Sequence, residues 1–293
     1  MVVYGPLAQV AVAATTAIVA LSILVTPYNA ALVNLVAVVC ITSAMVVYSC
    51  LIGISLLELP AFLWQIVFDS SHSRSYLLLF WTGNLLASIA FGFYVNKIGR
   101  SSTTKRKFFH LTVSLIYLSG LFFDRDFIWL AGWLMLCIFS IIETFRFFEV
   151  PPWSDSLNRF LLPFKDEQDS SILLTPIFLL MGVFLPLFLS PNDNTPHLYH
   201  LSGVASVGVG DSFAAIIGSK YGVTKWPRRK KTVEGSLAMG ASMAAFLLVA
   251  RLFCTENSGF VVVLLVSTVL SAVEAVTDNI DNIILPSLGY LLL

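Results

Sequence analysis

Residues 30–57 form one continuous apolar stretch, which reads AALVNLVAVVCITSAMVVYSCLIGISLL. It contains no Asp, Glu, Lys or Arg, and the first charged residue of the chain is Glu58. A helix of about 20 apolar residues is long enough to cross the ~30 Å of hydrocarbon in a bilayer. Residues 6–26 form a second uncharged apolar stretch of sufficient length. Both stretches therefore predict membrane-spanning helices.

The composition of the whole chain agrees with a membrane protein. Of its 293 residues, 57% are hydrophobic and 12% are charged, and the mean hydropathy is +0.86. A soluble domain of this length needs more polar residues to cover its surface. A backbone in lipid must satisfy its own hydrogen bonds, which favours helices, and the sequence lacks the short alternating segments of a membrane β-barrel. We therefore predict an all-α, polytopic integral membrane protein.

Further apolar segments follow the first two along the chain, and the complete set predicts about nine transmembrane helices. These segments lie near residues 76–95, 108–123, 127–146, 172–190, 198–218, 235–254 and 259–277. The tail from Ile283 to Leu293 is too short to cross a bilayer alone. We expect this tail to lie at the membrane interface or to pack against the other helices.

Lys and Arg residues gather in three loops. Loop 96–110 holds five of them, loop 143–171 three and loop 218–236 six, whereas the opposite side holds three. Because cytosolic loops of membrane proteins carry an excess of Lys and Arg, all three loops are expected in the cytosol. An enzyme that joins a cytosolic solute to a membrane lipid needs its polar groups on one face, whereas a transporter spreads them along a path through the bilayer.

The seventh predicted span and the loop after it carry the strongest local pattern. It reads GVGDS at 208–212, GSKYG at 218–222 and KWPRRKKTVEG at 225–235. Glycines let a backbone approach phosphate groups closely, and clustered Lys and Arg neutralise a triphosphate. Thr232 is expected to cap the helix that follows. The alternative is a loop that sets the topology and binds anionic lipid headgroups.

Two carboxylates point to a metal-assisted reaction at this face. Asp211 lies several residues inside an apolar span, where a carboxylate costs about 2.5–3.5 kcal/mol. A metal ion, a basic partner or a water-filled cavity must compensate, and the flanking glycines predict an irregular helix. Glu274 lies near the cytosolic end of the last full span, and Asp278 follows it by four residues, so the two share a helix face where the helix continues. Asp281 comes next. Such oxygen ligands suit Mg²⁺, and the alternatives are a structural ion pair for Asp211 and a solvated helix end for Glu274.

The loop 143–171 begins with a charged pair and continues with an amphipathic segment. Glu143 and Arg146 are three residues apart, so they can pair on one face of a helix. Residues 154–164 carry Leu and Phe at helical spacing. This spacing predicts a short helix that lies at the membrane interface.

Three further side chains are candidates for supporting roles. Asp166 and Asp169 belong to a short acidic run that either helps bind a metal–nucleotide or forms an ordinary turn. His110, at the mouth of the fourth predicted span, can hydrogen-bond a phosphate or a substrate hydroxyl, or be structural. The sequence has neither the phosphate-loop motif G-x-x-x-x-G-K-[ST] nor the protein-kinase motifs, so any nucleotide site is of a different kind.

Taken in order, these motifs resemble dolichol kinase from about residue 95 to the C-terminus. The elements around Asp211 and Thr232 are also similar to polyprenol and phytol kinases and to CDP-diacylglycerol synthases. The set that carries the resemblance is Lys107-Phe108-Phe109-His110, Glu143-x-x-Arg146-Phe147-Phe148, Asp166-Glu167-x-Asp169-Ser170, Gly208-Val209-Gly210-Asp211, Lys225-Trp226, Lys230-Lys231-Thr232-x-Glu234-Gly235 and Glu274-x-x-x-x-x-x-Asp281-Asn282.

The resemblance implies CTP-dependent phosphorylation of dolichol to dolichyl phosphate, at the cytosolic face of the endoplasmic reticulum membrane, for protein glycosylation. We expect Asp211, Lys231 and Glu234 to be the catalytic residues. A divalent cation, Mg²⁺ or Ca²⁺, is expected on Asp211 and Glu274, with His110, Glu143, Arg146, Asp166, Asp169, Glu274 and Asp281 in support. CTP is expected to bind Ser219, Lys220, Tyr221, Gly222, Val223, Thr224, Lys225, Trp226, Pro227, Arg228, Arg229, Lys230, Lys231, Thr232, Val233 and Glu234.

Animal and fungal dolichol kinases usually carry a longer N-terminal set of membrane helices. We therefore expect residues 1–95 to be a shortened set of N-terminal transmembrane helices and residues 96–293 to be a polyprenol-kinase-like catalytic domain. The implied partners are dolichol or a related polyprenol lipid, CTP and the bilayer. A net charge of zero gives no general attraction to nucleic acid, and no protein partner is readable. The rival functions are a cytidylyltransferase, another polyprenol or phytol kinase, and a membrane transporter.

Overall fold

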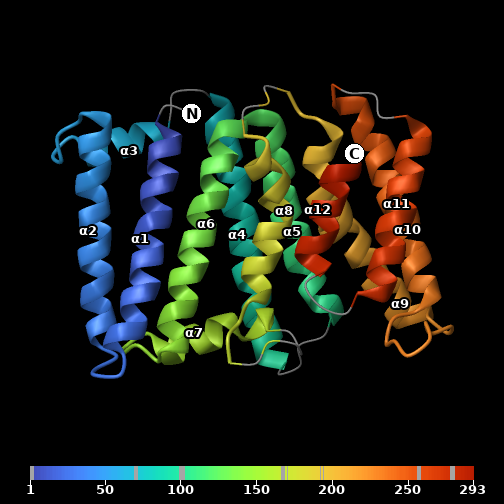
Figure 1. Ribbon diagram of the computed structural model, residues 1–293, viewed down its shortest axis with the longest axis horizontal. Coiled ribbons are helices and arrows are strands. Elements are labelled where there is room, and N and C mark those ends of the chain that lie inside the picture. Colours follow the sequence, from blue (N-terminus) through green and yellow to red (C-terminus); the bar gives the residue numbers. More distant parts are fainter. Residues whose placement is uncertain are drawn as a thin grey trace. The chain divides into compact units, whose positions relative to one another are not determined.

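The computed structural model describes residues 3–68, 72–98, 103–165, 169, 171–191, 193, 195–255, 259–277 and 281–293. Within these residues, the regular structure is helical apart from one isolated bridge between Lys225 and Thr232 (Figure 1). The expected all-α fold is therefore confirmed.

Each apolar stretch that was expected to span the membrane lies in a helix. Among the described residues, six helical segments are long and apolar enough to cross a membrane. They are α1 (Tyr4–Val25), α2 (Leu32–Ile52), Arg74–Val95 within α4 (His72–Ile98), α6 (Arg125–Phe147), Leu198–Tyr221, which ends in α9 (Asp211–Tyr221), and Val233–Phe253, which includes α10 (Val233–Ala250). Two more apolar helices are shorter, α8 (Thr175–Leu189) and α11 (Phe260–Val276). The described helices thus form a polytopic membrane protein.

The outward faces of these helices are apolar. In α2, Leu35, Val38 and Leu51 are each 58–61% exposed in the absence of a bilayer. Contiguous exposed apolar surface of this extent is rare on soluble proteins. These side chains are therefore suited to contact lipid tails.

The chain forms two compact units. The first comprises residues 1–99 and 123–177, and the second comprises residues 100–122 and 178–293. The functional division that we expected near residue 95 is a separate matter and stays a prediction.

In the first unit, α1 packs between α2 and α6 (Figure 1). The helix α7 (Ser154–Leu161) follows α6 and continues into the 3-10 turn η1 (Leu162–Phe164). It contacts α6 and α4 and buries Leu161, while Phe160 stays exposed. The expected amphipathic helix is therefore present. A short helix that the sequence analysis did not anticipate, α3 (Leu59–Val67), begins with Pro60 in its first turn.

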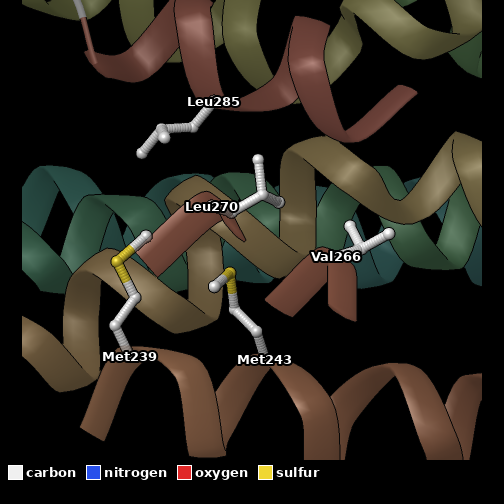
Figure 2. Packing of buried hydrophobic residues seen from close by; sticks show 5 residues of the cluster. All are labelled: Met239, Met243, Val266, Leu270 and Leu285. Atoms are coloured by element: carbon white, nitrogen blue, oxygen red, sulfur yellow. The ribbon is translucent and has the colours of Figure 1, made fainter. Parts of the chain in front are cut away.

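In the second unit, α10 packs between α9 and α11. Figure 2 shows Met239 and Met243 of α10 pointing toward Val266 and Leu270 of α11, with Leu285 above them. Leu285 belongs to the last helix, α12 (Asp281–Leu292), and is 1% exposed. Of the two expectations for the C-terminal tail, packing against the other helices is the one observed.

The seventh predicted span is irregular, as its glycines predicted. It begins as the 3-10 turn η2 (Leu198–Leu201), continues as the π-helix η3 (Val204–Gly210) and becomes α-helical at Asp211. A Cβ atom on Gly210 would lie 2.7 Å from the Cγ of Met243 in α10, which is closer than packing allows. The glycine therefore permits a close helix–helix approach. Turns of π-helix occur frequently at functional sites.

Candidate functional site

Asp211 is the first residue of α9, where the π-helix η3 ends. Its side chain is 21% exposed, so the carboxylate is largely removed from solvent. A carboxylate in such a place needs a compensating charge. The helix α5 (Thr103–Phe123) supplies that charge.

Lys107 and His110 of α5 both face Asp211. The Nζ of Lys107 donates a hydrogen bond to Oδ2 of Asp211. The Nδ1 of His110 lies 3.3 Å from the same oxygen and 3.0 Å from the carbonyl oxygen of Val207 in η3. Because a carbonyl can only accept, we place the ring hydrogen of His110 on Nδ1. Residues three apart share a helix face, so α5 presents both side chains together.

Lys231 pairs with two further carboxylates, those of Glu274 and Asp281. The Nζ of Lys231 lies 2.7 Å from Oε1 of Glu274 and 3.6 Å from Oδ2 of Asp281. It also donates to the backbone carbonyl of Glu274, at 2.7 Å. Glu274 lies in the last turn of α11 and Asp281 is the first residue of α12. The lysine therefore joins the basic loop to the ends of two helices.

The residues around Asp211 and those around Lys231 form one electrostatic cluster. The carboxylate of Asp211 interacts electrostatically with Lys231 and with the carboxylates of Glu274 and Asp281. Five charged side chains from five separate parts of the second unit thus act on one another, with the ring of His110 beside them. Gathering so many charges in a largely buried place costs free energy, which a purely structural role rarely explains.

The basic loop after α9 is a compact turn. The amide of Trp226 donates to the carbonyl of Lys231 at 3.0 Å, and the amide of Arg229 donates to the carbonyl of Trp226 at 3.1 Å. Arg228 adopts a left-handed backbone conformation with φ 61°. The side chains of Lys225, Arg228 and Lys230 are exposed. The loop therefore presents positive charge to solvent while Lys231 faces inward.

Thr232 and Glu234 fasten this loop to α10. The Oγ1 of Thr232 accepts a hydrogen bond from the amide of Gly235 at 3.2 Å, so the expected helix cap is confirmed. Both carboxylate oxygens of Glu234 accept from the amide of Thr224, at 2.9 and 3.2 Å. These contacts give Glu234 a role in loop shape, and its catalytic role stays a prediction.

The supporting residues expected in loop 143–171 belong to the first unit. Arg146 and Glu143 form a two-pronged ion pair, with Nε to Oε2 at 2.7 Å and Nη2 to Oε1 at 2.5 Å. Asp169 accepts hydrogen bonds from the amides of Leu174 and Thr175, at 3.1 and 3.3 Å, just where α8 begins. Asp166 lies outside the described residues.

The carboxylates of the second unit partly fit the expected divalent cation. Among the described residues, no three His, Cys, Asp or Glu side chains form a group that can hold a metal ion by themselves. Mg²⁺, however, is commonly held by one or two carboxylates together with substrate phosphates. Asp211 and Glu274 suit that arrangement, whereas a site made of protein ligands alone does not form here.

Lys107 is the residue of this cluster to which the sequence analysis assigned no role. It belongs to the Lys107–His110 motif, but it was grouped with the other Lys and Arg residues of the expected loop 96–110. Its position three residues before His110 was the available signal, since both then lie on one helix face. A metal ion, a basic partner or a water-filled cavity was expected to compensate the charge of Asp211, and the structure shows a basic partner, Lys107.

Comparison with known proteins bears on the identity of the chain. A model of the family described as dolichol kinase matches residues 2–179. The dolichol kinase of Homo sapiens is 36% identical over 255 residues, which cover 79% of this chain and 46% of that protein. Dolichol kinase EVAN of Arabidopsis thaliana is 34% identical over 245 residues, which cover 79% of this chain and 42% of that protein.

A fungal relative is matched over a shorter stretch. The dolichol kinase of Saccharomyces cerevisiae is 31% identical over 179 residues, which cover 60% of this chain and 33% of that protein. The chain thus spans less than half the length of each of these curated relatives. No solved structure matches it. The family match includes the motifs at 107–110, 143–148 and 166–170, whereas the motifs from Gly208 onward lie outside the matched residues. Because the match covers more than half of the chain, we conclude that this protein belongs to the dolichol kinase family.

Proposed function

We propose that the protein transfers the γ-phosphoryl group of CTP to the hydroxyl group of dolichol. The products are dolichyl phosphate and CDP, and the lipid product serves as the carrier for protein glycosylation. The reaction takes place at the cytosolic face of the endoplasmic reticulum membrane. The observation that carries this proposal is the gathering of Lys107, His110, Asp211, Lys231 and Glu274 at the end of an irregular membrane helix.

The basic loop is proposed to bind the phosphates of the nucleotide. Lys230, Lys231 and Arg229 provide the positive charge, and glycines on either side allow the backbone to approach. Thr232 caps α10, so the N-terminus of that helix adds a partial positive charge at the same place. The exposed side chains of this loop are reachable by a soluble nucleotide.

Phosphoryl transfer depends mainly on positioning and charge neutralisation. The lipid alcohol enters laterally from the bilayer, and its oxygen forms a bond to the γ-phosphorus while the bond from that phosphorus to the bridging oxygen of CDP breaks. Asp211 accepts the proton of the alcohol, and Lys107 and His110 orient its carboxylate. Asp211 and Glu274 would hold a divalent cation, which would supply charge neutralisation at the phosphates.

The test is transfer of label from nucleotide to lipid in membranes that contain this chain. CTP labelled at the γ-phosphorus is supplied with dolichol, and unlabelled ATP is added as a competing donor. We expect label in dolichyl phosphate, CDP as the by-product and little competition by ATP. Release of pyrophosphate in place of CDP would show attack at the α-phosphorus, which is the reaction of a cytidylyltransferase.

A further inference from the structure

Each of the three carboxylates of the cluster lies against the ammonium group of a lysine. Lys107 is hydrogen-bonded to Asp211, and Lys231 lies against Glu274 and Asp281. The three carboxylates are also the oxygen ligands that a divalent cation would seek. Two lysine side chains of the protein therefore contact the oxygens that a divalent cation at this site would contact.

These ion pairs differ from ordinary surface pairs in their burial. The side chain of Lys107 is 11% exposed and that of Lys231 is 23% exposed, whereas Glu274 is 9% exposed. Exposed pairs contribute little to stability, but a largely buried charge that loses its partner is strongly unfavourable. Neither a lysine nor its carboxylate can therefore be left alone in this site.

Because the basic residue of each ion pair is a lysine, it can leave its carboxylate for another anion. The ammonium of lysine is a compact charge on a flexible chain, without the fixed fork of arginine. It interacts with phosphate oxygens as readily as with carboxylates. A cation bound to a triphosphate brings a new partner for both members of each ion pair. The cation can pair with the carboxylate, and the phosphate oxygens can pair with the lysine.

From these contacts we infer that Lys107 and Lys231 act as stand-ins for the divalent cation in the nucleotide-free protein, and move to the phosphate oxygens when cation and nucleotide bind together. This inference rests on the proposed use of a nucleoside triphosphate. It assigns Lys107, which has no other proposed contact with nucleotide, to the triphosphate site.

The exchange couples the binding of cation and nucleotide. A cation alone would displace the lysines from the carboxylates without giving them an anion, and a nucleotide alone would give the lysines an anion but leave the carboxylates unpaired. Each ligand should therefore raise the affinity for the other. Removing one ammonium group should weaken this coupling and strengthen the binding of the cation alone.

The experiment measures Mn²⁺ binding to the purified, nucleotide-free protein through the electron paramagnetic resonance signal of free Mn²⁺. We expect Lys107→Met to bind Mn²⁺ about tenfold more tightly than the wild-type chain, within the usual range of coupling between sites. The gain should disappear when Asp211→Asn is added to Lys107→Met. The matched control is Lys97→Met, which makes the same change at an exposed lysine of the other unit.

Equal Mn²⁺ affinity in the wild-type chain and in a folded Lys107→Met variant would overturn the inference. If Lys107→Met fails to fold, Lys231→Met carries the same test, because Lys231 lies in a loop and faces Glu274 and Asp281. The measurement needs no turnover, so it is independent of the proposed reaction. Tighter Mn²⁺ binding in a chain that transfers no label would support the exchange while contradicting the kinase reaction.

Discussion

The ion pair of Glu143 and Arg146 and that of Lys107 and Asp211 are similar in charge and burial, but they differ in construction. Glu143 and Arg146 are neighbours on one helix turn, and both also bind backbone groups, the amide of Leu173 and the carbonyl of Ser171. Lys107 and Asp211 are 104 residues apart in sequence and belong to different helices. One pair is local and the other exists only in the folded unit.

The difference predicts that a ligand can replace a partner more readily in the Lys107–Asp211 pair than in the Glu143–Arg146 pair. The planar guanidinium of Arg146 satisfies both oxygens of Glu143 in a fixed geometry, and the backbone bonds leave little for a ligand to replace. A lysine pair has no such fixed geometry, and the carboxylate of Asp211 lies beside His110 and interacts electrostatically with Lys231. The first pair should therefore govern stability and the second should govern activity.

The largest expected effect is the loss of activity in Asp211→Asn. The amide keeps the size of the side chain but removes its charge and its ability to accept the proton. We expect phosphoryl transfer to fall by about 1,000-fold or more, which is typical when a group that acts on the transition state is removed. The labelled-CTP assay measures this effect, and circular dichroism with membrane fractionation checks that the variant is folded and inserted. Activity close to wild type would remove Asp211 from the mechanism.

For Glu143→Ala in the first unit, we expect a loss of stability and no change in the KM for CTP. Removing one partner of a buried pair leaves Arg146 without its carboxylate, and the amide of Leu173 also loses its acceptor. We expect the free energy of unfolding to fall by about 3 kcal/mol. Thermal unfolding in detergent measures the change. The KM for CTP of the protein that remains folded should be unchanged, and an increase in that KM would mean that this pair also serves the nucleotide.

A smaller effect is expected for Lys231→Ala, assayed at saturating divalent cation. The variant removes one positive charge from the proposed phosphate site, so the KM for CTP should rise about tenfold, equal to about 1.4 kcal/mol. The KM for dolichol should stay the same. Lys97→Ala is the matched control in the other unit, because Lys97 is exposed in the last turn of α4. An unchanged KM for CTP in Lys231→Ala would mean that the basic loop only sets topology.

The smallest effect is expected for the helix cap. Thr232→Ala removes the acceptor for the amide of Gly235 and should destabilise the protein by about 1 kcal/mol. Thr232→Ser keeps the hydroxyl and should recover most of that loss. Thermal unfolding of the two variants side by side measures the difference. Equal melting temperatures for the alanine and serine variants would show that the cap is not what holds this end of α10.

Features set by local sequence were predicted correctly. Apolar stretches became helices because a backbone in lipid has few other ways to satisfy its hydrogen bonds. The glycines before Asp211 predicted an irregular helix, Thr232 predicted a cap, and the spacing of Glu143 and Arg146 predicted a pair. Each of these depends on residues within about one helix turn, and such short-range geometry can be read from spacing.

Long-range contacts were not predicted in the same way. The sequence placed Lys107 in a basic loop, but it could not show that this lysine reaches Asp211. It grouped Lys231 with the residues expected to bind CTP, whereas the folded chain turns its ammonium toward Glu274 and Asp281. Glu234, expected to be catalytic, binds the amide of Thr224. A side chain's partner depends on which helices pack together, and spacing carries no such information.

The sequence by itself determined that this protein is a bundle of membrane helices with its polar residues gathered in a few loops. Composition and local spacing suffice for that, because the bilayer restricts what a backbone can do. Only the tertiary structure decided which charges meet. By packing α5 and η3 together and bringing the basic loop to the ends of α11 and α12, the fold converts scattered residues into one cluster around Asp211. A charge removed from solvent must find a partner, and that partner is fixed by the fold.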